Sequence, residues 1–131
     1  MNEGLTFMDD GLTFDEWLEQ TQHKRDELAA YGLTPLPADV GERHLDIEKA
    51  IQNADDSGRL LADGEMYLTQ AKATAMFAAL KEHDDLTAKE REFVIKDAVS
   101  KIQRLVDGLA VTNRTIHDRI FASQNANRSR L

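Results

Sequence analysis

The chain of 131 residues fits one domain, and 41% of its residues are hydrophobic, which is enough to form a core. Because it contains no cysteine, disulfide frameworks, thiolate metal sites and cysteine catalysis are excluded, and seven glycines with two prolines are too few for the turns of an all-β chain. The net charge of −8 arises from 24 acidic and 16 basic side chains, and the composition is too apolar for a disordered acidic tail.

The first predicted helix follows a short internal repeat. The sequence Gly-Leu-Thr-Phe occurs at residues 4–7 and again at 11–14, and only the second copy continues into a capping box formed by Thr13 and Glu16. In such a box the hydroxyl and the carboxylate each accept a hydrogen bond from a backbone N–H that the first helical turn leaves free. We therefore predict a short helix within residues 13–32.

The segments on either side of this helix are predicted to be non-helical. Residues 1–12 lack the capping acid and are expected to form a flexible arm. Residues 33–37 contain Pro35 and Pro37, which disfavour the helical conformation in the residues before them, so this segment is expected to be an extended linker. The aromatic side chains that are candidates for binding a partner through the arm are Phe7, Phe14 and Trp17.

Residues 38–131 predict a long antiparallel helical hairpin that resembles a coiled coil. Apolar or small residues recur at steps of three and four over 38–82 and again over 88–123, beyond which the polar tail should fray. A turn at 83–87 leads into a second capping box, and a short turn makes the two helices antiparallel neighbours. The glycine-containing segment 55–58 is the most favourable place for a break. The residues expected to be buried on the last helix are Ile102, Leu105 and Leu109.

The register of this hairpin predicts how closely its helices approach. If the turn is centred on residues 84 and 85, facing residue numbers add to about 169, which places Leu105 near Gly64 and Leu61 near Gly108. The apolar stripe of the last helix is wider than its neighbours in one chain can cover, so we predict that oligomerisation completes a bundle. The candidate oligomer or partner interface consists of Val99, Ile102, Val106, Leu109 and Ala110.

No pattern in the sequence predicts catalysis. The four histidines are dispersed and lack the spacing of metal ligands. Glu65 interrupts an apolar stripe alone, which is more typical of a register determinant than of a metal ligand in a helical nucleotide hydrolase, our least favoured hypothesis. Glycine-rich phosphate loops and nucleophile elbows are absent from the sequence. We therefore predict no enzymatic activity and no catalytic, cofactor-binding or metal-binding residue.

The charge changes sign along the chain. Residues 1–30 hold eight acids and two bases, whereas residues 91–131 hold four acids and eight bases. We favour attraction between opposite ends of the folded chain over a nucleic-acid surface, because acids interrupt the basic positions and no aromatic residues alternate with them. Two alternatives stay open: an acidic nucleic-acid mimic that inhibits a host nuclease or defence complex, and a nucleic-acid accessory factor that uses the basic last helix.

The expected location follows from two absences in the sequence. No apolar run reaches membrane-spanning length, and the first residues lack the charged-then-apolar order of a signal peptide. We therefore expect no membrane contact and a cytoplasmic location.

Part of the sequence resembles a family. Residues 67–73 form an alanine-containing helical segment, residues 86–92 begin with Leu-Thr-x-x-Glu, and residues 123–128 form a polar tail. In this respect residues 47–131 resemble small phage and prophage helical-hairpin proteins of unknown role. The resemblance implies a virus-encoded accessory protein without catalytic residues that acts in the host cytoplasm. Our leading hypothesis is a non-enzymatic helical interaction protein that forms homo-oligomers and binds a protein partner.

Overall fold

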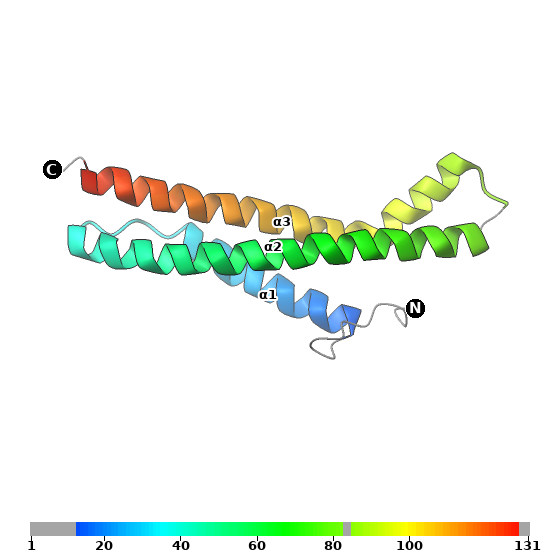
Figure 1. The fold of residues 1–131 in the computed structure, drawn as a ribbon, viewed down its shortest axis with the longest axis horizontal. Coiled ribbons are helices and arrows are strands. Elements are labelled where there is room, and N and C mark those ends of the chain that lie inside the picture. The colour runs from blue at the N-terminus through cyan, green and yellow to red at the C-terminus, as the bar shows by residue number, and fades with distance from the viewer. Residues whose placement is uncertain (1–12, 83–84, 129–131) are drawn as a thin grey trace.

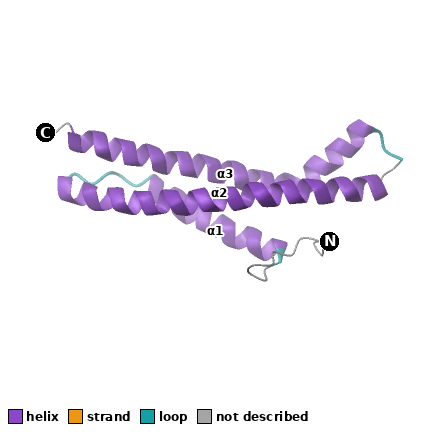
Figure 2. Ribbon diagram, in the orientation of Figure 1, coloured by secondary structure: helices purple, strands orange, loops and turns teal. Residues whose placement is uncertain are grey.

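The computed structural model describes residues 13–82 and 85–128, and these form three helices without a strand. The helices are α1 (Phe14–Gly32), α2 (Val40–Glu82) and α3 (Ala88–Arg128), as Figures 1 and 2 show. The all-α prediction is confirmed. The expected arm at 1–12, with Phe7, lies outside the described residues, as do residues 83–84 of the expected turn.

Both predicted capping boxes are confirmed. At the start of α1, the Glu16 N–H donates to Thr13 Oγ1 at 3.2 Å and the Thr13 N–H donates to Glu16 Oε1 at 3.4 Å. At the start of α3, Thr87 and Glu90 make the same pair of bonds at 3.2 and 3.3 Å. Each box satisfies N–H groups that would otherwise lack an intrahelical acceptor, and so fixes where the helix begins.

Helix α2 begins later than predicted and continues through its expected break. Its first turn starts at Val40 because the Asp39 carboxylate accepts from the Glu42 N–H at 3.0 Å and caps the helix. At the expected break, Ser57 is buried and its hydroxyl donates to the Ala54 carbonyl while it accepts from the Asn113 amide of α3. This cross-helix bond lies where small residues let α3 approach, and α2 continues through it as one helix.

Helices α2 and α3 lie side by side and run in opposite directions (Figure 1). Three contacts along their length give the register. Arg43 Nε donates to Asn127 Oδ1 at 2.7 Å, Asn113 Nδ2 donates to Ser57 Oγ at 2.7 Å, and Val106 lies against Gly64. The residue numbers of each pair add to 170, one away from the expected 169. A Cβ on Gly64 would lie 3.1 Å from Val106 Cγ2, so a larger residue there would have to displace the Val106 side chain, and glycine allows the close approach.

Helix α1 crosses the pair obliquely and changes two expected contacts (Figure 1). Gly108 faces the Arg25 side chain of α1 rather than Leu61, and Gly64 faces Val106 and Leu109 rather than Leu105. The expectation about Gly108 was wrong because it treated α2 as the neighbour of that side of α3. The main core cluster joins all three helices and contains Trp17, Leu68, Ala71, Val99, Ile102, Leu105, Val106 and Leu109.

The C-terminal part of α3 is longer than predicted. The helix continues to Arg128 instead of ending near Ser123, although its last residues are polar. Ser123 is fully buried, and Asn127 receives the hydrogen bond from Arg43 of α2. Because α2 supplies a polar partner there, the tail stays helical rather than fraying.

Candidate interaction surface

The residues predicted as an oligomer interface lie inside the single chain. Val99, Ile102, Val106 and Leu109 are between 0% and 7% exposed, and Ala110 is half-buried. This corrects the expectation that the stripe would stay uncovered without a second copy. The reason is that α1 and α2 cover α3 from two sides. The burial expected for Ile102, Leu105 and Leu109 is confirmed.

The aromatic residues predicted to bind a partner also differ from expectation where they are described. Trp17 is 6% exposed and makes an edge-to-face contact with Tyr67 of α2, with ring centroids 4.8 Å apart. Phe14 packs against the same cluster. Trp17 therefore attaches α1 to α2 and is not presented to a partner.

A buried ion pair joins the three helices near the linker. The Arg119 guanidinium of α3 donates to both carboxylate oxygens of Asp46 on α2, at 3.0 and 3.1 Å, and the side chains are 5% and 10% exposed. Tyr31 of α1 donates its hydroxyl proton to Asp46 at 3.0 Å, and its ring lies 4.7 Å from the guanidinium carbon. Two-point bonding and burial make this a rigid structural joint.

Arginine side chains also hold the linker in place. Arg119 donates to the carbonyls of Thr34 and Pro35. Arg43, which is 5% exposed, donates to the carbonyls of Pro37 and Ala38 at 3.0 and 2.8 Å. The proline segment has few backbone bonds of its own, so these guanidinium groups satisfy its carbonyls.

The position of Tyr31 predicts an alkaline loss of stability. Burial, together with the hydrogen bond and charge of Asp46, raises the pKa of Tyr31 above its usual 10.0, while Arg119 partly offsets this. The folded state therefore holds the phenol proton more tightly than the unfolded state does. Its contribution to stability is fully present below about pH 10 and is lost as the pH rises through the higher folded-state pKa.

This loss is measured by urea unfolding at several values between about pH 9 and 11. The free energy of unfolding of the wild type should fall more steeply with pH than that of Tyr31→Phe, which has no proton to lose at this position. Equal slopes for the two proteins would show that Tyr31 titrates alike in both states.

The described residues contain no group of three or more histidine, aspartate and glutamate side chains placed to hold a metal ion. Nor does any helix in the described ranges combine the length and apolarity needed to cross a membrane. The features that could meet a partner are hollows and exposed side chains on the helix surfaces.

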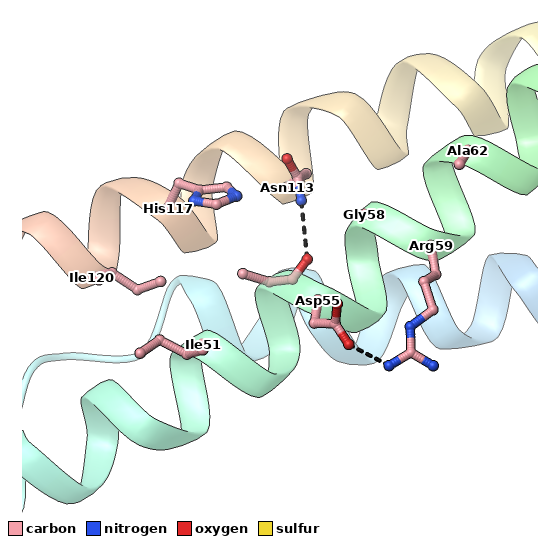
Figure 3. A pocket seen from close by; sticks show the side chains of 9 residues that line it. Ile51, Asp55, Gly58, Arg59, Ala62, Asn113, His117 and Ile120 are labelled. Carbon is pink, nitrogen blue, oxygen red and sulfur yellow. Dashed lines mark hydrogen bonds and ion pairs between the residues drawn. The ribbon is translucent and has the colours of Figure 1, made fainter.

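An open groove of about 540 Å³ runs between α2 and α3. Figure 3 shows Ile51 and Ile120 at one end of the groove and Ala62 at the other. Asn113 Nδ2 reaches across from α3 and donates to the Ala54 carbonyl at 3.2 Å. The remaining lining residues are Ala54, Asp55, Gly58, Arg59 and His117, of which Asp55 and Arg59 pair with each other. Half of the lining residues of α2 are small: Ala54, Gly58 and Ala62.

The α2 wall of this groove continues as an uncovered apolar face, which we call the outer stripe. Its large members are between 48% and 54% exposed, and Phe77 beside them is 79% exposed. The outer stripe consists of Ile51, Gly58, Ala62, Met66, Thr69, Ala73, Met76 and Leu80. The sequence-based expectation of a single apolar stripe on this helix merged Ile51, Gly58 and Met76 with buried positions and left out Met66 and Leu80. The signal was present: Ile51, Met66 and Leu80 do not share a face with buried Ala50, Leu68 and Ala79.

Two further hollows carry charge of opposite sign. One on α1 is lined by Glu16, Glu19, Gln20, Gln22, His23 and Asp26. The other, between α2 and α3, is lined by Lys72, Lys96, Val99, Ser100, Gln103 and Arg104. The change of charge along the sequence therefore gives an acidic hollow on α1 and a basic hollow between α2 and α3.

Comparison of the chain with protein-family models, with curated proteins and with solved structures found no match.

Proposed function

We propose that the protein is a non-enzymatic helical interaction protein that acts by binding another macromolecule through the outer stripe of α2. The observation that carries this proposal is the exposure of large apolar side chains along one face of α2, at Ile51, Met66, Met76 and Leu80. Soluble proteins rarely leave contiguous apolar surface uncovered, and such surface is typical of binding sites for proteins. The cost of keeping it exposed is removed when a partner covers it.

The sequence resemblance suggests where such a protein would act. A phage-encoded accessory protein would act in the host cytoplasm by attaching to a macromolecule rather than by catalysis. A rigid helical body with an uncovered face suits that role, because a preformed surface loses little conformational entropy on binding.

The proposal is tested by cross-linking in the cells that produce the protein. A photoreactive residue at exposed Leu80 should capture a protein, and Met76→Glu should reduce the yield about tenfold, because it places a charge in the contact. Val111→Glu is the matched control, since Val111 is 58% exposed on α3 and should leave the yield unchanged. Both variants should keep the wild-type helix content by circular dichroism. A yield that Met76→Glu leaves unchanged would contradict the proposal.

The two charged hollows support the alternatives. A nucleic-acid mimic would use the acidic hollow of α1, so its capture of a basic protein would depend on Glu16 and Glu19 and would weaken with salt. A nucleic-acid accessory factor would use Lys72, Lys96 and Arg104, and would retard DNA in a gel. Met76→Glu should affect neither activity strongly, so the three functions are separable.

A further inference from the structure

We infer that a second copy of this chain covers the outer stripe, with the two α2 helices packed antiparallel about a two-fold axis near residues 65 and 66. This inference rests on the proposed function, because it names the partner of the same face. It differs from the interface predicted from sequence, in which Val99, Ile102, Val106 and Leu109 belong to the core of one chain.

The spacing of the face suits antiparallel pairing with itself. On this side of α2, Asp55 lies between Ile51 and Gly58 of the outer stripe, and Met66 lies at its centre. Apart from Met66, the residues fall at positions 51, 55, 58 and 62, and again at 69, 73, 76 and 80. The steps are four, three and four in each group, so the pattern reads the same from either end. A two-fold axis between residues 65 and 66 therefore aligns Ile51 with Leu80 of the second copy, and Gly58 with Ala73 of the second copy.

Side-chain sizes agree with this alignment. Gly58, Ala62, Thr69 and Ala73 are small and lie near the proposed axis, so the two helices can approach closely there. Ile51 and Leu80 are large, 54% exposed, and face each other at the two outer ends of the contact. Asp55 lies within this face, and its charge is already paired with Arg59.

The distribution of charge decides the direction. Residues 40–65 of α2 hold seven acids and three bases, whereas residues 66–82 hold two bases and one acid. Antiparallel packing places the acidic half of each helix beside the basic half of the other and brings Glu48 near Lys81 of the second copy. Parallel packing would place acid against acid along the first half, which repulsion disfavours.

The position of α1 leaves this face open. Tyr31 and Trp17 of α1 contact α2 at Asp46 and Tyr67, whereas Ala62 on another side of α2 lines the open groove. A second copy seated there contacts α3 through Asn113, His117 and Ile120, which line the same groove. The dimer would then have four long helices at its centre and the two α1 helices outside.

The test uses the absence of cysteine from the natural chain. Met66→Cys places a thiol beside the axis and should give a disulfide-linked dimer under mild oxidation, since a disulfide needs Cα atoms within about 7 Å. Ile51→Cys and Leu80→Cys should each give little disulfide-linked product when oxidised alone, and should form a mixed disulfide when combined. Within one chain these positions are about 43 Å apart along α2, so they cannot bridge internally. Val111→Cys is the control and should not cross-link.

The oligomeric state without cross-linking is measured by light scattering after size exclusion. The wild type should have twice the chain mass of 14.7 kDa, and Met66→Glu should have the mass of one chain with unchanged helix content. In each copy the introduced carboxylate would stand beside that of Glu65, so four carboxylates would lie near the axis. A wild type of 14.7 kDa at high micromolar concentration would overturn the inference. If Ile51→Cys alone formed as much disulfide-linked dimer as Met66→Cys, the antiparallel arrangement would be overturned, because it keeps the two copies of residue 51 apart. Capture of a foreign protein by a monomeric chain would leave the proposed function standing without the dimer.

Discussion

Replacing Asp46 with alanine should lower the free energy of unfolding by about 3–5 kcal/mol, because it leaves the Arg119 guanidinium buried without its counter-charge. The same change removes the carboxylate acceptor of the Tyr31 hydroxyl and leaves it only the backbone carbonyl of residue 46, at 3.2 Å. Arg119 keeps its bonds to the carbonyls of Thr34 and Pro35, but neutral acceptors do not balance a cation in a low-dielectric site. The measurement is urea unfolding followed by circular dichroism at neutral pH.

Further variants separate the net contribution of the ion pair to stability from the cost of leaving Arg119 unpaired. The double variant Asp46→Leu with Arg119→Met removes both charges and should recover most of the lost stability, since a buried pair is often replaceable by apolar side chains of similar volume. Asp63→Ala is the matched control, because Asp63 is an exposed aspartate on the same helix and should change stability by less than about 0.5 kcal/mol. A loss for Asp46→Ala no greater than for Asp63→Ala would refute this account of the joint.

The local parts of the fold were predictable from the sequence. Both capping boxes depend on residues three positions apart, so the sequence alone specifies Thr13 with Glu16 and Thr87 with Glu90. The periodic apolar positions predicted the burial of Ile102 for the same reason, since the period fixes which side chains share a face.

The contacts between distant segments were not predictable. Arg119 and Asp46 are far apart in the chain, and nothing near either residue shows that they meet over the linker. For the same reason the position of α1 against the other two helices could not be predicted. It depends on the contact of Trp17 with Tyr67 and on Arg25 lying over Gly108. Without that position the wide stripe of α3 was read as a free surface, while the outer stripe of α2 was merged with its buried one.

The substitution Val106→Asp distinguishes these two views of α3, and it should unfold the chain rather than only dissociate an oligomer. Val106 is 7% exposed, lies against Gly64 and belongs to the main apolar core cluster. A carboxylate there is either desolvated or forced to bind a proton, and we expect a loss of several kcal/mol and a fall in the melting temperature on the order of 10 °C or more. A true interface residue would instead leave a folded chain with unchanged helix content.

The control is Val111→Asp, which places the same group on the same helix where valine is 58% exposed, and its stability should stay within about 0.5 kcal/mol of the wild type. Two further observations identify the cause as burial. The destabilisation by Val106→Asp should persist at protein concentrations that keep the chain monomeric, since it acts within one copy. It should also shrink as the pH falls toward 4, because burial raises the pKa of the introduced carboxyl and the neutral form is tolerated better. Val106→Asp with wild-type stability and weakened association would mean that α1 leaves the α3 stripe uncovered in solution.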